Sequence, residues 1–245
     1  MKNWRHLSLV TVAGLAWLST AGCANQKTWV YKSNSYAPAG RSTEKKIAVL
    51  PYEDGRENKN SNMIAMYVLP LMPFGWQELN APEGVQAHAT SGLWLNYKPT
   101  EDFPKALAED LRKTALFSDA FFDYRRESGD YAVQGKIVST LYVGRIISYG
   151  LSVYGPDLWL IGLPAAYTRN ELAVDLSLVD AKSNKVLFQK LYTTDPVAKV
   201  HWIYAIRDDM AYADMLAKVN KQFCTDIQPI VLNTTEAAAA APVSQ

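Results

Sequence analysis

Apolar and polar residues alternate along much of this chain with the period of two that half-buried β-strands require. The clearest case is the stretch 171–179, in which apolar residues occupy every second position: Leu172, Val174, Leu176 and Leu178. Successive side chains of a strand point to opposite faces of its sheet, so this period predicts a strand with one buried face. A polar turn at 180–184 and a second strand at 185–193 complete a predicted hairpin.

Three more strands are predicted before this hairpin. Residues 46–51 are apolar from Ile47 onward and end at Pro51, which predicts a short strand buried on both faces. A second short strand is expected at 120–124. A longer one is expected at 130–143, where apolar and polar residues alternate again.

Two helices are predicted from apolar positions that recur every three or four residues. The stretch 100–117 carries one such stripe, with Thr100 as the expected N-cap. The stretch 202–223 carries a second stripe. The order of strands and helices predicts one α+β domain over residues 45–228, with helices packed on a mixed β-sheet.

The first 22 residues have the three parts of an export signal. Lys2 and Arg5 supply the positive start, residues 7–18 an apolar core too short to span a bilayer, and residues 19–22 small side chains. Because Cys23 follows directly, the stretch resembles the bacterial lipoprotein signal, or lipobox. The alternatives are an ordinary secretory signal, with Cys23 as a bystander, and a signal anchor.

The lipobox resemblance implies that Cys23 carries diacylglycerol, becomes the first residue of the mature chain and is then N-acylated. Acyl chains would hold the protein on a membrane, since each buried methylene contributes about 0.8 kcal/mol. Ala24 stands where an aspartate would imply the inner membrane. The resemblance therefore implies the inner leaflet of the outer membrane, facing the periplasm. Polar composition predicts a flexible tether at 23–44 and a disordered tail at 229–245.

The charge balance and the two cysteines indicate which binding partners and disulfides to expect. The chain has 25 Lys and Arg against 24 Asp and Glu, so it lacks the basic excess of a nucleic-acid-binding protein. If Cys23 is acylated, Cys224 has no intramolecular partner, and no structural disulfide is expected. A small buried side chain is the expected role of Cys224, and an intermolecular disulfide is the alternative.

No pattern of catalytic or metal-binding residues stands out. Beyond the signal, histidine occurs only at His88 and His201, so a Cys/His zinc site is not expected. Ser152 lies in a stretch similar to a nucleophile elbow, but one residue too many separates it from the second glycine, and a turn is its expected role. We therefore expect no enzyme activity, no cofactor and no metal.

Four short motifs mark the predicted strands and turns: IAVLP at 47–51, LFS at 116–118, DYAVQG at 130–135 and LVDAKS at 178–183. Together they resemble a group of periplasmic lipoproteins that includes the curli-secretion lipoprotein, the activator lipoproteins of penicillin-binding proteins and the N-terminal domain of the Tol-Pal translocation protein. The resemblance implies a domain that binds other envelope proteins and often oligomerises. This chain departs from it by two long insertions, at 58–99 and 145–170.

Both insertions contain strongly apolar, aromatic segments, at 69–76 and 158–164, which Pro and Gly interrupt too often for a membrane-spanning helix. Two interpretations remain open. Either the segments pack against each other or over a sheet face, or they form an interaction surface, between subunits or with a lipid interface. In the second case the expected anchors are Trp76, Trp94, Trp159 and Leu160.

Two classes of function follow from these features. The first is a membrane-anchored, non-enzymatic module that binds envelope proteins or associates with itself. The second is a periplasmic carrier that binds a lipid or a small apolar ligand between the insertions. A hydrolase would depend on Ser152 alone and is the weakest of the three.

Overall fold

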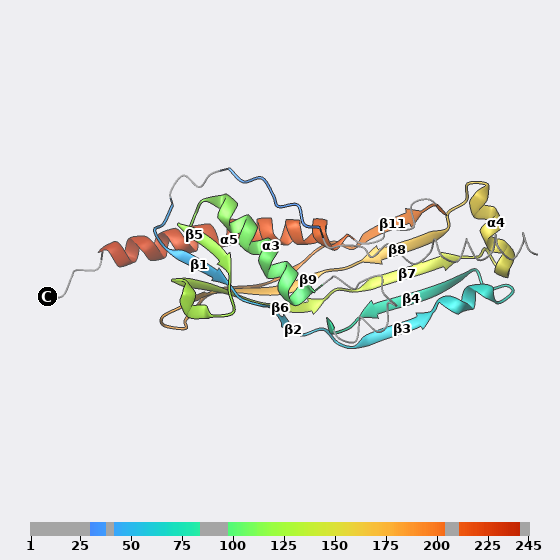
Figure 1. The fold of residues 1–245 in the computed structure, drawn as a ribbon, viewed down its shortest axis with the longest axis horizontal. Coiled ribbons are helices and arrows are strands. Elements are labelled where there is room, and N and C mark those ends of the chain that lie inside the picture. Colours follow the sequence, from blue (N-terminus) through green and yellow to red (C-terminus); the bar gives the residue numbers. More distant parts are fainter. Residues whose placement is uncertain (1–29, 38–41, 84–97, 204–210, 241–245) are drawn as a thin grey trace, which may run out of the picture.

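The computed structural model describes residues 30–37, 42–83, 98–203 and 211–240. A sheet with helices packed on it lies at one end of an elongated molecule, and a second sheet extends toward the other end (Figure 1). Within these described ranges, no helix combines the length and the apolar character needed to cross a membrane. Cys23, His88 and Trp94 lie outside them.

The first sheet is mixed. Its strand order is β10-β9-β6-β1-β5, with β2 beside β6. The strands are β1 Lys46–Val49, β2 Glu53–Asp54, β5 Asp119–Phe122, β6 Tyr131–Ser139, β9 Ala173–Asp180 and β10 Val186–Thr193. β1 runs parallel to β5 and β6, whereas β9 is antiparallel to β6 and β10. The predicted α+β fold, with helices on a mixed sheet, is confirmed.

Helix α3, Pro99–Thr114, packs against β1, β5 and β6 through the predicted stripe. It ends three residues before the prediction because Ala115 adopts a left-handed conformation, with φ of 53°. Thr100 lies within the helix rather than at its N-cap, and its hydroxyl donates to Glu83 Oε2 at 2.6 Å. Phe103, Leu107 and Leu111 are buried in the core between helix and sheet.

The C-terminal helix differs from the prediction at both ends. Helix α5 spans Tyr212–Ala240, whereas Trp202 directly follows strand β11. The expected tail from residue 229 instead lies largely within α5. An apolar residue at every fourth position continues the buried stripe past that point: Val219, Phe223, Ile227 and Val231. This stripe keeps the helix on the core where composition alone indicated disorder.

Residues 30–37, expected to be part of a flexible tether, pack against α3 and α5. The backbone N–H of Asn34 donates to Asp110 Oδ1 at 2.9 Å, and its side-chain amide donates to the Ala217 carbonyl at 2.8 Å. The Tyr31 hydroxyl also donates to Asp110, and Asn220 Nδ2 donates to the same carboxylate at 3.1 Å. One fully buried carboxylate therefore holds this segment to both helices.

The second sheet consists largely of the two insertions and is antiparallel throughout, in the order β11-β8-β7-β4-β3. Its strands are β3 Lys59–Met63, β4 Phe74–Asn80, β7 Tyr142–Ile147, β8 Ala166–Asn170 and β11 Val197–His201. The single strand predicted at 130–143 is therefore two, because the chain leaves the first sheet after Ser139 and enters the second at Tyr142. Alternation continues through this passage, which is why the sequence shows no boundary.

Candidate functional site

The two apolar segments meet at the far end of the second sheet. η1, Ile64–Val68, precedes β4, whereas η3, Ser152–Tyr154, and α4, Gly155–Leu160, follow β7 (Figure 1). Leu71 N–H donates to the Gly150 carbonyl at 3.0 Å, and the Ser152 hydroxyl donates to the Val68 carbonyl. We refer to residues 64–72 and 149–163 together as the apolar tip.

The close fit of the tip on the sheet depends on glycine. A Cβ atom on Gly75 of β4 would lie 2.0 Å from the carbonyl oxygen of Ile64, so η1 approaches the strand at a distance that only glycine permits. Three tip residues other than glycine adopt left-handed backbone conformations: Leu71, Tyr149 and Ser152. Such conformations cost about 1 kcal/mol or more each and persist only where the surrounding contacts impose them.

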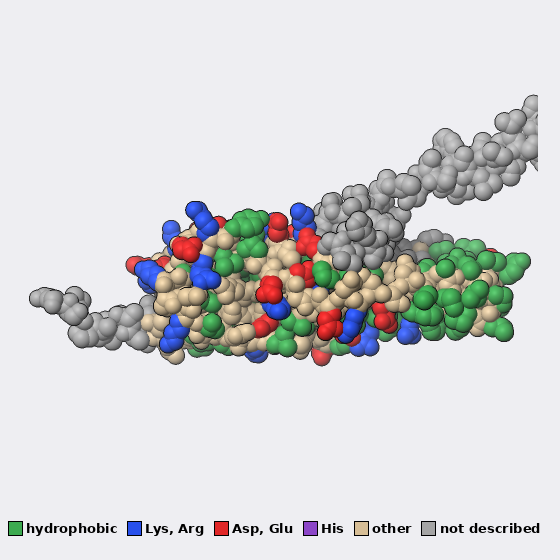
Figure 2. All heavy atoms as spheres, turned by 90° about the horizontal axis from the view of Figure 1, so that it is seen from below, with side chains coloured by type: hydrophobic (Ala, Val, Ile, Leu, Met, Phe, Trp, Pro, Cys, Tyr) green, Lys and Arg blue, Asp and Glu red, His purple; other side chains and the backbone are tan. Residues whose placement is uncertain are grey.

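Large apolar side chains remain exposed on the tip despite this packing. The most exposed are Leu71 at 89 %, Ile161 at 73 %, Tyr154 at 70 % and Leu160 at 68 %. Figure 2 shows hydrophobic side chains gathered at this end of the molecule, while charged side chains cover the other half. The tip sequence contains no Lys or Arg and a single acidic residue, Asp157. Apolar surface this concentrated marks an interaction site in most soluble proteins.

Many polar groups of the tip are paired internally. Trp159 Nε1 donates to the Ile147 carbonyl at 2.9 Å, and the Tyr149 hydroxyl donates to the Pro164 carbonyl at 2.7 Å. Backbone N–H groups at both turns also have internal acceptors: Leu69, Leu71, Met72, Tyr149, Leu151, Tyr154, Gly162 and Leu163. The surface that the tip presents is therefore hydrocarbon to an unusual degree.

The predicted anchor residues differ in how exposed they are in the structure. Leu160 is exposed on the tip, but Trp159 is half-buried behind it and Trp76 is half-buried in β4. Trp94 lies outside the described residues. The most exposed tip residue, Leu71, is not among the anchors that the sequence predicts. The absence of Lys and Arg from both segments is the sequence signal that indicates an apolar surface there. The segments both pack together and stay exposed, so the two interpretations are not exclusive.

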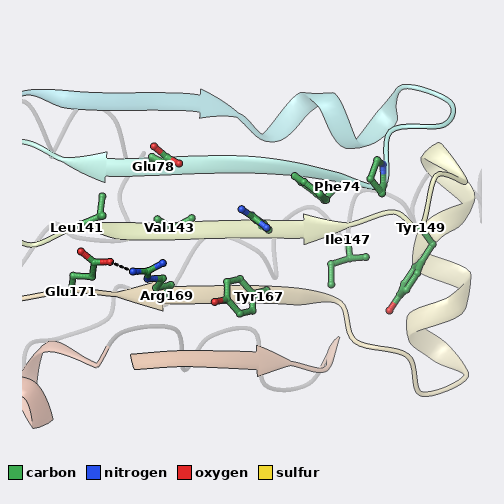
Figure 3. A pocket seen from close by; sticks show the side chains of 11 residues that line it. Phe74, Glu78, Leu141, Val143, Ile147, Tyr149, Tyr167, Arg169 and Glu171 are labelled. Atoms are coloured by element: carbon green, nitrogen blue, oxygen red, sulfur yellow. Dashed lines mark ion pairs between the residues drawn. The ribbon is translucent and has the colours of Figure 1, made fainter. Parts of the chain in front are cut away.

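Beside the tip, one face of the second sheet has a hollow of about 500 Å³ (Figure 3). It is lined by residues of both insertions and of β7, including Phe74, Glu78, Val143, Arg145, Tyr167 and Arg169. The Arg145 guanidinium lies 4.9 Å from the ring centroid of Phe74 and 6.0 Å from that of Tyr167. Arg169 pairs with Glu171. Among the described residues, neither Arg145 nor Glu78 has a partner of opposite charge.

A polar cluster joins the two sheets. The fully buried Arg56 side chain donates to Asp54 at 2.8 and 2.6 Å and to the Thr140 hydroxyl at 2.8 Å. Partial burial raises the pKa of Asp54, but the hydrogen bonds and positive charge of Arg56 outweigh it, and the pKa lies below its usual value. Tyr212 of α5 donates to the Thr140 carbonyl at 2.8 Å. This cluster positions the second sheet, and hence the tip, relative to the helices.

The remaining candidate residues have structural surroundings. Cys224 is a buried free thiol, and burial raises its pKa to about 12. His201 is buried, with Nε2 2.7 Å from the Thr168 hydroxyl. Ser152 is a turn residue whose hydroxyl bonds within the tip. Within the ranges that the structure covers, no three His, Cys, Asp or Glu side chains gather in a way that would hold a metal ion.

The chain was compared with known proteins. No family model matches it, and no curated protein is similar to it. Among solved structures, a Xanthomonas campestris protein of the family DUF330 is similar with a TM-score of 0.46 and 10 % identity, covering 86 % of this chain and 99 % of its own. A neuraminyllactose-binding hemagglutinin homolog from Helicobacter pylori gives a TM-score of 0.36 and 9 % identity, covering 88 % and 100 %.

A third solved structure is a PelC dodecamer from Paraburkholderia phytofirmans, with a TM-score of 0.33 and 12 % identity, covering 82 % of this chain and 98 % of its own. All three similarities are distant and extend along nearly the whole of the other chain. None transfers a residue role to this protein. The resemblance to the curli-secretion and penicillin-binding-protein activator group stays a prediction from short motifs.

Proposed function

We propose that this protein is a membrane-anchored envelope lipoprotein that acts as a non-enzymatic interaction or assembly module, with the apolar tip as its contact surface. The anchor is Cys23, at the inner leaflet of the outer membrane, and the body faces the periplasm. The observation that carries the proposal is the tip itself: exposed Leu, Ile and Tyr side chains, no cation and one carboxylate.

Physical chemistry favours contact at this surface. Removing apolar area from water contributes about 25 cal/mol per Å², and depletion of charge is what distinguishes the centre of an interface from ordinary surface. The left-handed residues that build the tip indicate that its shape is maintained against a local conformational preference. A surface of this kind supports docking.

The test is photo-crosslinking in intact cells, with a photoreactive amino acid in place of Leu71. The matched control carries the same group in place of Leu191, which is 51 % exposed on β10 of the first sheet. We expect a discrete adduct, to protein or to lipid, from position 71 and none from position 191. In a Cys23→Ser background the adduct should decline, because the body is no longer delivered to its site. Equal labelling from both positions would contradict the proposal.

A second candidate function, a carrier of a small amphiphile, is favoured by the hollow beside the tip. The hollow combines an apolar floor with one guanidinium and one carboxylate that lack partners of opposite charge among the described residues. Arg145 suits a phosphate and Glu78 suits an amine, so the pair matches the two ends of a zwitterionic headgroup. The stacking of Arg145 on Phe74 fixes the guanidinium over the hollow.

For the carrier, the probe is lysophosphatidylethanolamine below its micelle concentration, measured by calorimetry on the purified protein. We expect Arg145→Met to weaken binding about tenfold, the loss of one charge-assisted hydrogen bond. Arg125→Met changes an exposed arginine on the first-sheet half and should leave binding unchanged. Equal affinity in all three proteins, or no binding by the wild type, would dismiss the carrier.

A further inference from the structure

We infer that the surface on which the apolar tip docks is lipid: the tip inserts into the boundary between headgroups and acyl chains of the membrane that holds the Cys23 anchor. This inference rests on the proposed function, and it names the occupant that the function leaves open. Three features carry it, namely the pairing of polar groups within the tip, the kinds of side chain that the tip exposes and the short chain that joins the body to the anchor.

The internal pairing of polar groups in the tip favours a lipid partner over a protein partner. In hydrocarbon no solvent or partner donor is available, so every unpaired N–H or C=O costs several kcal/mol. A protein partner would meet loop polar groups with groups of its own. Many N–H groups of the tip turns have internal acceptors, and the hydroxyl groups of Ser148 and Ser152 donate to tip carbonyls. This internal pairing lowers the cost of moving the tip from water into an apolar environment.

The side chains follow the polarity gradient of a bilayer surface. Aliphatic residues are the most exposed, led by Leu71 and Ile161. Trp159 and Trp202 are less exposed, and their indole N–H groups donate to the carbonyls of Ile147 and Gly162. Tryptophan is enriched at the level of lipid headgroups for this combination of apolar ring and polar N–H. Figure 2 shows hydrophobic side chains concentrated at this end of the molecule.

The anchor keeps the body of the protein close to one membrane. The bonds of residues 31 and 34 to Asp110 fix the chain to the body from residue 30 onward, so only seven residue steps separate it from Cys23. At no more than about 3.5 Å per residue, this span is shorter than roughly 25 Å. The bilayer that receives the acyl chains is therefore present at high effective concentration, and a weak second contact suffices.

The experiment uses the mature acylated protein in phosphatidylcholine vesicles. An environment-sensitive fluorophore is attached at Leu71→Cys or, as a control, at Leu191→Cys, since Cys23 is blocked by acylation and Cys224 is buried. We expect quenching by doxyl-labelled lipids to be at least about threefold greater at position 71 than at position 191. Adding Leu160→Ser and Ile161→Ser should remove most of that difference, since each lost aliphatic side chain weakens partition about tenfold.

Control substitutions on β10 and a test of salt dependence show whether the quenching depends on the apolar tip. Val186→Ser with Leu191→Ser removes two side chains of 51 % exposure from β10 and should leave quenching of a label at Leu71→Cys unchanged. Because the tip has no cation, added salt or phosphatidylglycerol should change the signal by less than about twofold. Equal, low quenching at both label positions overturns the lipid inference. If photo-crosslinking at position 71 still yields a protein adduct, the proposed function survives, and if it yields none, both fail.

Discussion

Asp110→Ala is expected to lower the free energy of unfolding by about 3 kcal/mol, because the buried Asn220 and the half-buried Tyr31 and Asn34 lose one acceptor at once. The Asp110 carboxylate is fully buried and accepts hydrogen bonds from Tyr31, Asn34 and Asn220. Burial and the bond to Asp110 raise the pKa of Tyr31, so its hydroxyl stays protonated and donates. Urea unfolding followed by tryptophan fluorescence measures the loss.

The same substitution should release residues 30–37 before the whole domain unfolds. Limited proteolysis of folded Asp110→Ala is expected to cut this segment, which the wild type protects. Glu109→Ala is the matched control, since Glu109 is the exposed neighbour on the same helix, and it should change stability by less than about 0.5 kcal/mol. A fully stable Asp110→Ala protein with a protected segment would show that the segment is held by other contacts.

Arg56→Met is expected to destabilise the fold by about 3–5 kcal/mol, the usual cost of leaving one member of a buried ion pair without its partner. The Arg56 side chain is fully buried and links Asp54 to Thr140 at the junction of the two sheets. Lys59→Met removes an exposed cation paired with Glu57 nearby and should cost less than about 1 kcal/mol. Thermal unfolding of both variants at neutral pH makes the comparison.

The Arg56 variant should also change how stability depends on pH. In the wild type the pKa of Asp54 is lowered on folding, so its contribution is present above the unfolded value of about 3.9 and disappears as pH falls through the lower folded value. Without the Arg56 guanidinium, only the backbone N–H donors of residues 56 and 83 oppose the effect of burial on the Asp54 pKa, so this acid-dependent loss should shrink. An unchanged acid limb in Arg56→Met would mean that the backbone donors, not Arg56, lower the pKa.

Local alternation was enough to predict the hairpin of the first sheet. The hairpin of β9 and β10 follows directly from apolar residues at every second position, because that period is compatible with one register only. The sequence does not reveal the boundary between β6 and β7, because apolar residues alternate with the same period in both strands. Only the long-range pairing of β7 with β4 assigns β7 to the second sheet. Registers between distant segments leave no trace in a single sequence.

The two ends of the domain were misjudged for a related reason. The composition around Tyr31 and Asn34 is that of a flexible tether, but their side chains bond to a carboxylate 79 and 76 positions away. The tip was located by its apolar sequence, yet exposure could not be predicted, since a run such as 158–164 suits a core and a surface equally. Leu163 is half-buried while Leu160 is exposed, and the turn between them determines which of the two side chains faces solvent.

Two chain segments connect the first sheet to the second sheet, which carries the tip. The pairing of β6 with β9 ends at Ser139 and Ala173, and the pairing of β7 with β8 resumes at Tyr142 and Asn170. Two antiparallel chain segments thus pass side by side from one sheet to the other, and two such connections resist bending more than a single one would. The orientation of the tip is therefore coupled to that of α3 and α5 through both connections.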